Sequence, residues 1–243
     1  MSLAADLKIL YRMAANPGRG RNHAERLESF YAGQAATYDD FRRRLLQGRR
    51  ELWEAIPTPE QGVWVDLGGG TGANLELLGS RIDQLRKVYV VDLSPSLLTV
   101  ARERIAARGW TNVEAVRADA VTFRPPTGTA DVVTFSYSLT MIPDWFAVID
   151  NAWEMLKPGG LVGVVDFYVA RKYPAESMAQ HDWWTRSFWP VWFGRDNVFL
   201  SPDHVPYLQR KFEPMACAEC RSKVPYLPCV RVPYYRFLGR RGS

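Results

Sequence analysis

The order of apolar and polar residues predicts a helical N-terminal part followed by a regular alternation of strands and helices. Leucines recur at helical spacing over residues 3–13, and the Asn-Pro-Gly sequence at 16–18 ends that helix. A second helical pattern extends over about residues 23–56 and stops at Pro57. Beyond this proline the apolar residues come in short runs, which are typical of buried strands.

Short apolar strands and amphipathic helices then follow one another in the order expected of repeated strand–helix–strand units. We predict helices over about residues 71–78, 94–108 and 144–156, the second of them capped by Ser94-Pro95. We predict strands at 63–67, 88–91, 113–116, 132–135 and 161–165. Such units form a parallel sheet with helices on both faces.

The C-terminal part has a different pattern. Residues 223–238 indicate two strands rich in Val and Tyr with prolines at their ends, which suits an antiparallel edge. An aromatic-rich insertion over about residues 173–209 fits no core strand. The expected fold is therefore α/β, with a doubly wound, mostly parallel seven-stranded sheet and an antiparallel edge hairpin.

This pattern divides the chain into four parts. We expect N-terminal helices over 1–60, a strand–helix core over 61–170, an aromatic-rich insertion over 171–210 and C-terminal strands over 211–243. The total of 243 residues suits one α/β domain with additions.

Composition excludes several classes of protein. Hydrophobic residues make up 47% and charged residues 23%, as in globular proteins. No apolar run approaches the roughly 18 residues of a membrane span, and no signal-peptide pattern opens the chain. Three cysteines, with one Cys217-x-x-Cys220 pair, make neither a disulfide framework nor a zinc site, so we expect reduced thiols and no metal. These features favour a cytoplasmic location.

Charge is unevenly distributed along the chain. Residues 1–50 carry a net charge of +5 and residues 205–243 a net charge of +6, whereas the part between them carries −6. If both ends lie on one face, that face would attract anionic phosphate, in a lipid or in a nucleic acid. Solvated helices and hairpins are the alternative explanation.

The strongest motif is a strand that runs into a glycine-rich turn, Val-Trp-Val-Asp-Leu-Gly-Gly-Gly-Thr-Gly over residues 63–72. Gly68, Gly70 and Gly72 allow the backbone to approach a ligand closely, at positions where any Cβ would collide with it. The turn lies at the carboxyl end of the sheet, where open α/β folds bind ligands. The same glycines also fit a dinucleotide fingerprint. The glycines alone therefore do not separate a nicotinamide enzyme from a methyltransferase.

Three carboxylates at strand ends separate these two classes of enzyme. Asp66 would repel a pyrophosphate but attract the ammonium of a methionine group. Asp92 is placed to accept hydrogen bonds from both ribose hydroxyls, and Asp119 to accept one from an adenine amino group. The residues that follow them, Leu93 and Ala120, are predicted to bind the cofactor as well. Each acid alone is more commonly a cap or turn residue. Three of them at strand ends predict one shared ligand.

With these residues, the chain resembles the class I S-adenosylmethionine-dependent methyltransferases over about residues 60–170. Residues 66–72 match the first motif of that family, Asp92 and Asp119 match its later acids, and Lys-Pro-Gly-Gly at 157–160 matches its turn into the fifth strand. The resemblance implies a Rossmann-like methyltransferase fold and S-adenosylmethionine as cofactor.

The family resemblance also assigns residues to the methionine end of the cofactor. It implies that Tyr38, in the N-terminal helices, covers this end and that Ser136 and Tyr137 line the methyl group. Tyr38 sits among apolar positions, so a place in the core is the alternative.

Methyl transfer is a single in-line displacement, so the protein has to orient the acceptor and exclude water. An amine acceptor must also lose its proton, and the candidate bases are Tyr137, Asp166, His181 and His204. We predict Tyr137 and His204 as the catalytic residues. A lone histidine is more often structural than catalytic.

The insertion carries six large aromatic residues and two arginines. Aromatic faces attract quaternary ammonium groups, and Trp with Arg suits a membrane interface. Simple packing of a cap over the sheet is the alternative. The residues are Trp183, Trp184, Phe188, Trp189, Trp192 and Phe193, interleaved with Arg186 and Arg195.

Over nearly its whole length the chain resembles the methyltransferase half of betaine lipid synthase. The resembling segments are residues 23–31, 34–39, 44–49, 63–72, 201–204, 224–228 and 232–235. The resemblance implies three N-methylations of diacylglyceryl-homoserine, which is a lipid substrate. From the aromatic insertion and the basic ends we also expect peripheral contact with the inner membrane face. The chain is too short to hold the partner domain of the fused enzyme, so we expect a separate aminocarboxypropyl-transferring enzyme to supply the substrate.

Other acceptors compete with this prediction. Phosphatidylethanolamine and the ring carbon of a lipid quinone are the nearest alternatives. A nucleic-acid-binding methyltransferase or a non-catalytic binding module would use the basic ends and bind with a steep salt dependence. The sequence has Ser-Tyr-Ser-Leu at 136–139 where a base-flipping enzyme would have Asn/Asp-Pro-Pro-Tyr, so we expect no nucleic-acid partner.

Overall fold

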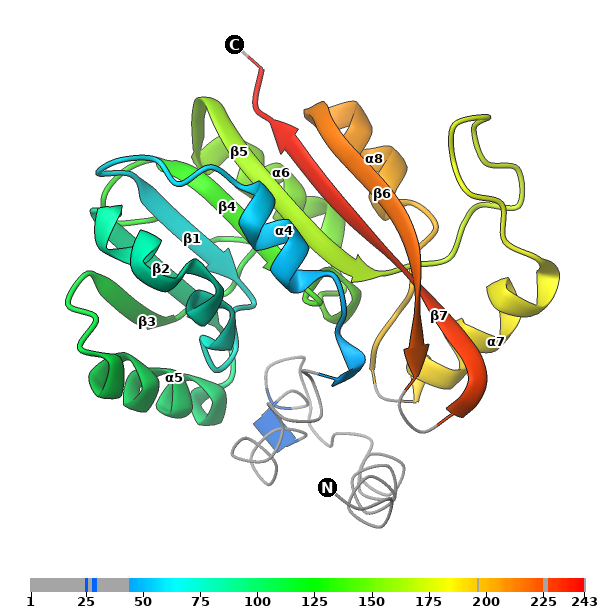
Figure 1. Ribbon diagram of the computed structural model, residues 1–243, viewed down its shortest axis with the longest axis horizontal. Helices are drawn as coiled ribbons and strands as arrows, with labels where there is room; N and C mark the ends of the chain where they lie inside the picture. The colour runs from blue at the N-terminus through cyan, green and yellow to red at the C-terminus, as the bar shows by residue number, and fades with distance from the viewer. Residues whose placement is uncertain (1–24, 26–27, 30–43, 196, 225–226, 243) are drawn as a thin grey trace.

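One seven-stranded sheet organises the molecule, with strand order β3-β2-β1-β4-β5-β7-β6 (Figure 1). The computed structural model describes residues 25, 28–29, 44–195, 197–224 and 227–242. The first five strands are parallel, and β7 pairs antiparallel with both β5 and β6. The strands are β1 (Val63–Leu67), β2 (Lys87–Asp92), β3 (Val113–Arg117), β4 (Ala130–Ser136), β5 (Leu156–Phe167), β6 (Glu213–Val224) and β7 (Leu227–Arg240).

Helices cover both faces of this sheet, so the predicted doubly wound α/β fold is confirmed (Figure 1). Apolar side chains of α4, η1 and α5 pack on one face, and those of α6 and α8 pack on the other. Strand β1 is buried on both faces because it lies inside the parallel part. The helical segments are α4 (Arg49–Ala55), η1 (Ala73–Gln84), α5 (Pro95–Arg108), η2 (Leu139–Met141), α6 (Trp145–Met155), α7 (Trp183–Gly194) and α8 (His204–Lys211).

The ends of α5 follow directly from the sequence. Ser94 is the N-cap, and its hydroxyl accepts a hydrogen bond from Leu97 N at 3.3 Å, with Pro95 in the first turn. Gly109 closes the helix in the left-handed conformation, at φ 66°. The predicted helix over 94–108 is confirmed at both ends.

The position of the antiparallel hairpin was predicted wrongly in one respect. The sequence pattern placed both strands within residues 223–238, but β6 already begins at Glu213. Only Ser222 and Val224 are buried along β6, because it is the edge strand of the sheet. A strand with one solvated face and an irregular burial pattern carries no apolar alternation that a sequence could reveal.

The aromatic-rich insertion contains two helices, α7 and α8, and no strand of the sheet. The predicted helix over 3–13 and most of the one over 23–56 lie outside the described residues. Helix α4 is the part of the second prediction that can be compared with the structure. Within the described residues, no helix has both the length and the apolar character needed to cross a membrane.

Candidate functional site

A cavity opens at the carboxyl ends of β1, β2, β3 and β4, where the parallel strands meet the loops that follow them. Its empty volume is about 600 Å³, part of which is open to solvent. Seven residues of the predicted site line it: Gly68, Gly70, Asp92, Leu93, Asp119, Ala120 and Tyr137.

The glycine-rich turn forms one wall of the cavity because its backbone folds under the end of β2. Gly68 N and Gly69 N both donate to Val91 O, at 2.8 and 3.1 Å. Gly68 has φ +69°, and a Cβ built on it would stand 2.4 Å from Ser138 Cβ. Any other residue at position 68 would therefore be strained and would collide with the opposite loop. Gly72 does not line the cavity; it caps η1 instead.

Asp92 joins the glycine turn to the start of α5. Its Oδ2 accepts a hydrogen bond from Gly70 N and its Oδ1 accepts one from Ser94 N, both at 2.9 Å. The carboxylate is thereby held at the cavity wall in one orientation. A pre-oriented carboxylate at a strand end suits the paired hydroxyls of a ribose.

Glu28 contacts the start of α5, which the sequence did not predict. Its carboxylate accepts hydrogen bonds from Ser94 Oγ at 2.7 Å, from Ser96 N at 3.3 Å and from Ser96 Oγ. These groups lie at the N-terminus of α5, where a negative charge is favoured by the helix dipole. The N-terminal part of the chain is therefore connected to the wall that Asp92 forms.

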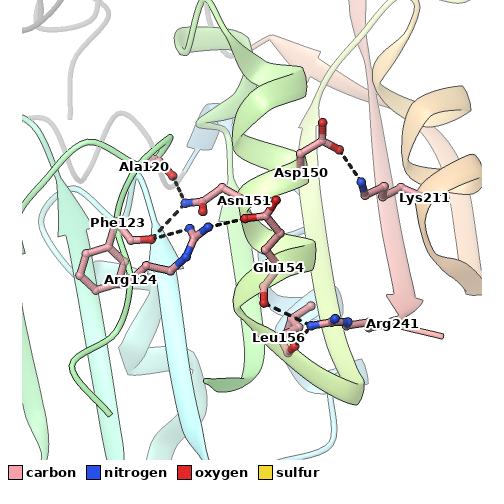
Figure 2. A network of polar contacts seen from close by, with 9 residues as sticks. All are labelled: Ala120, Phe123, Arg124, Asp150, Asn151, Glu154, Leu156, Lys211 and Arg241. Carbon is pink, nitrogen blue, oxygen red and sulfur yellow. Dashed lines mark hydrogen bonds and ion pairs between the residues drawn. The ribbon is translucent and has the colours of Figure 1, made fainter. Parts of the chain in front are cut away.

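The third predicted acid lies in a tight turn that α6 holds in place. Asp119 Oδ1 accepts a hydrogen bond from Val121 N at 2.9 Å, and Asp119 O accepts one from Phe123 N at 2.8 Å. Figure 2 shows Asn151 of α6 beneath this turn, with its Nδ2 donating to Ala120 O at 2.8 Å and to Phe123 O at 3.1 Å. The buried amide fixes the backbone at this end of the cavity.

Asp66 lies beneath the glycine turn rather than on the cavity wall. The side chain is buried, and its Oδ1 accepts a hydrogen bond from Thr134 Oγ1 at 2.8 Å. Trp64 Nε1 in turn donates to Thr134 Oγ1 at 3.0 Å, and Asn74 Nδ2 lies 3.4 Å from Asp66 Oδ2. Asp66 supports the turn in this arrangement, and contact with a methionine ammonium stays a prediction.

Tyr137 forms the opposite wall, after the end of β4. It has φ 55°, which an L residue rarely adopts, and its hydroxyl donates to Gln47 O at 2.6 Å. Burial, reinforced by the nearby Asp166 carboxylate, raises the pKa of Tyr137 well above its ordinary value. The hydroxyl is therefore protonated at neutral pH and engaged with backbone. Ser136 precedes it with a buried hydroxyl, does not line the cavity, and has no hydrogen-bond partner among the described residues.

A buried carboxylate anchors the floor of the cavity. Asp166 accepts hydrogen bonds from Thr140 N, Thr140 Oγ1 and Phe167 N, at 3.1, 2.7 and 2.8 Å. Burial raises its pKa to about 7, although these hydrogen bonds favour the charged form. Asp166 thus holds η2 in position from below and does not line the cavity.

Neither candidate histidine lines the cavity. His204 begins α8, is fully buried against Trp145 with ring centroids 4.8 Å apart, and has its pKa lowered to about 3 by burial. His181 Nδ1 accepts a hydrogen bond from Ala170 N at 3.0 Å, and burial lowers the pKa of this ring as well. These geometries suit structural roles, and a catalytic role for His204 stays a prediction. Tyr38 lies outside the described residues.

Six further residues line the cavity and were not predicted. Most are apolar residues next to a predicted acid or in the loop after β4, where an apolar residue looks like core in the sequence. They are Val91, Leu97, Ala118, Ser138, Met141 and Ile142.

The charge of the cavity distinguishes between the two cofactor classes. Among its described lining residues are two carboxylates, Asp92 and Asp119, and no Lys, Arg or His. A pyrophosphate would meet only repulsion from these groups, whereas a cationic nucleoside is favoured. The residues present therefore fit S-adenosylmethionine better than a dinucleotide.

Comparison with known proteins agrees with this geometry. Residues 65–160 match the family model described as a methyltransferase domain. This stretch is similar to a methyltransferase domain, and the residues of the cavity fit S-adenosylmethionine as its cofactor. The chain has the fold of the N-methyltransferase NodS from Bradyrhizobium japonicum, solved with S-adenosyl-L-homocysteine, with TM-score 0.59 and 14% identity over 85% of this chain and 99% of that one.

Sequence relatives of the chain include methyltransferases whose names refer to ubiquinone and menaquinone. It is 30% identical over 150 residues to the ubiquinone/menaquinone biosynthesis C-methyltransferase UbiE of Ectopseudomonas mendocina, which covers 59% of each chain. It is 26% identical over 159 residues to the demethylmenaquinone methyltransferase of Lactococcus lactis, which covers 63% of each chain. The chain thus spans less than two thirds of the length of these relatives.

Proposed function

We propose that this methyltransferase transfers a methyl group to an acceptor carried on a lipid, and that the first candidate acceptor is the ring carbon of a lipid quinol. The relatives named above act on quinones, and their similarity extends over the cofactor core. S-adenosylmethionine, when bound, supplies the electrophilic methyl group. The acceptor is a proposal because the similarity leaves a third or more of each chain unmatched.

The observation that carries the proposal is an apolar, aromatic wall at the β4 end of the cavity. Tyr137, Met141 and Ile142 line this end, and the Tyr137 ring packs edge-on against Phe167 with centroids 4.6 Å apart. Phe167 stacks in turn on Phe193 of α7 at 4.9 Å. Flat rings pack well against such surfaces, and the apolar wall excludes water from the reacting atoms.

The remaining residues of the cavity would bind and orient the cofactor. Asp92 would accept hydrogen bonds from the ribose hydroxyls, and Asp119 would accept one from the adenine amino group. The sheet order puts these acids at the β2 and β3 ends, away from Tyr137 at the β4 end. The methyl group would therefore face the aromatic wall, where orientation of the acceptor can contribute about 7–11 kcal/mol to lowering the barrier.

A second candidate acceptor is a lipid head-group amine, as in diacylglyceryl-homoserine or phosphatidylethanolamine. The specific support is the resemblance to betaine lipid synthase in segments outside the matched core, such as residues 201–204 and 232–235. An aromatic wall also suits a cation that becomes progressively methylated.

A panel of acceptors with labelled cofactor tests the proposal. Purified protein is incubated with a demethylated prenyl quinol, diacylglyceryl-homoserine, phosphatidylethanolamine and a duplex RNA. Label in the quinol supports the first candidate, and label in either amine lipid supports the second and rejects the first. Label confined to RNA, or no label in any acceptor while the cofactor binds, rejects the lipid-borne acceptor.

A further inference from the structure

The described part of the chain concentrates its exposed apolar side chains in one region. Of its seven exposed large hydrophobic residues, five lie between residues 173 and 199. Trp183, Trp184 and Val191 of α7 are exposed to 69%, 62% and 70%. Isolated exposed apolar residues are ordinary, but a cluster on one helix marks an interaction surface.

Helix α7 is apolar on both sides, and among the described residues one side is buried against the core while the other is partly or fully exposed. Trp189 and Phe193 are buried against the core. On the other side, Phe188 lies between Trp184 and Trp192, with ring centroids 5.8 and 5.6 Å away. These three residues are spaced four apart and therefore share one face. We call Trp183, Trp184, Phe188, Val191 and Trp192 the α7 patch.

Basic residues flank the α7 patch. Arg195 is exposed at the end of α7. At the end of the β6–β7 hairpin, Lys223 pairs in register with Arg231, and both are exposed. The hairpin end lies near α7 (Figure 1), and the charge of Arg221 acts on Asp182 at the α7 N-cap. Among the described residues 173–195, the exposed acids are Glu176 and Asp182, against the three exposed basic residues Arg195, Lys223 and Arg231.

A continuous row of rings connects the α7 patch to the cavity. Phe188 contacts Trp189 at 5.0 Å, and Trp189 contacts Phe193 at 5.6 Å. Phe193 stacks on Phe167, which contacts Tyr137 on the cavity wall. These linking rings are buried, so they fix the position of α7, and with it the patch, relative to the cavity wall.

From these observations we infer that the α7 patch docks on an anionic phospholipid bilayer, with its tryptophans at head-group depth and its flanking arginines and lysine on phosphate. Tryptophan suits this depth because its ring is apolar and its N–H is polar. A row of half-exposed aromatic residues with basic neighbours has the character of interfacial helices. The inference deepens the proposed function and rests on a lipid-borne acceptor.

Vesicle flotation tests the inference without cofactor or acceptor. The full chain is mixed with vesicles of phosphatidylcholine alone or with phosphatidylglycerol added, and its bound fraction is measured. We expect binding to the mixed vesicles that Trp184→Glu lowers about tenfold. Met215→Glu is the matched control, since Met215 is exposed to 45% on β6 and lies outside the patch; it should bind like the unchanged chain.

Three outcomes would overturn the inference: no binding to the mixed vesicles, equal binding of Trp184→Glu, or a Trp184-dependent dimer in sedimentation without vesicle binding. The proposed function fails separately, through absence of methyl transfer to any lipid while flotation succeeds. A short-chain acceptor in solution adds a further distinction. Trp184→Glu should methylate it like the unchanged chain and lose turnover only on vesicle-embedded acceptor.

Discussion

The hydroxyl of Tyr137 donates a hydrogen bond to the backbone carbonyl of Gln47, at 2.6 Å, and so ties the cavity wall to the segment before α4. Tyr137 adopts a left-handed backbone conformation at this point. Strain of this kind is retained where the surroundings over-determine it, often at functional sites. The tyrosine therefore acts in our account as a positioning residue.

Replacing Tyr137 with Phe should separate positioning from base catalysis. The ring would remain, and only the hydrogen bond to Gln47 would be lost, which is worth about 1 kcal/mol. We expect kcat/KM to fall by roughly fivefold with an unchanged pH profile. A general base would contribute about 100-fold or more, so a loss of that size with loss of one limb of the pH profile would contradict positioning.

Gly68→Ala tests the fit between the glycine turn and the loop after β4. The new Cβ would meet Ser138 Cβ at 2.4 Å, and φ would remain unfavourable at +69°. Gly109→Ala is a matched control, since its φ is +66° and no atom lies within 4 Å of a Cβ there. Both variants should lose about 1 kcal/mol of unfolding free energy from backbone strain. Only Gly68→Ala should lose more and also weaken cofactor binding, as urea denaturation and calorimetry would measure.

The buried carboxylate of Asp166 predicts a pH dependence of stability. Its pKa is raised to about 7 in the folded chain, against about 3.9 when unfolded. Between these values the folded state holds a proton that the unfolded state has lost, so this group makes stability fall as pH rises from about 4 to 7. The full effect is on the order of 4 kcal/mol.

Denaturation of the unchanged chain and of Asp166→Asn at several pH values measures this effect. We expect the stability of the Asn variant relative to the unchanged chain to rise with pH over that range and to level off above it. A difference that is independent of pH would show that Asp166 titrates normally.

His204→Leu should retain methyl transfer. The imidazole is buried against Trp145, its pKa is lowered to about 3, and neither ring nitrogen has a partner among the described residues. Replacing an unpaired polar group with an apolar one of similar size is neutral or stabilising. We expect turnover within about twofold and no loss of melting temperature. A 100-fold loss of kcat in a folded variant would restore the catalytic role that the sequence suggested.

The sheet could be predicted because its inner strands are short apolar runs between glycines and prolines. The strand-end acids Asp92 and Asp119 were also predictable, since the carboxyl ends of parallel strands converge. The position of Asp66 was harder to predict. Asp66 lies on the same face of β1 as Trp64, and η1 covers this face through Asn74. This cover depends on tertiary packing, which the sequence pattern does not reveal. The same holds for Met141 and Ile142, which look like core residues until the loop after β4 is placed beside a cavity.

Calorimetry of S-adenosylmethionine binding to the unchanged chain and to Asp92→Ala tests whether this cofactor binds at the carboxyl ends of the parallel strands. Asp92 orients the glycine turn and α5 through two hydrogen bonds of 2.9 Å, so its removal leaves the backbone donors of Gly70 and Ser94 without this partner at the cavity wall. We expect one site on the unchanged chain and a Kd at least tenfold higher for Asp92→Ala, or a loss of about 1.4 kcal/mol or more. Asp83→Ala, on the exposed side of η1, should bind like the unchanged chain. Absence of binding to the unchanged chain, or equal affinity in Asp92→Ala, would contradict the account.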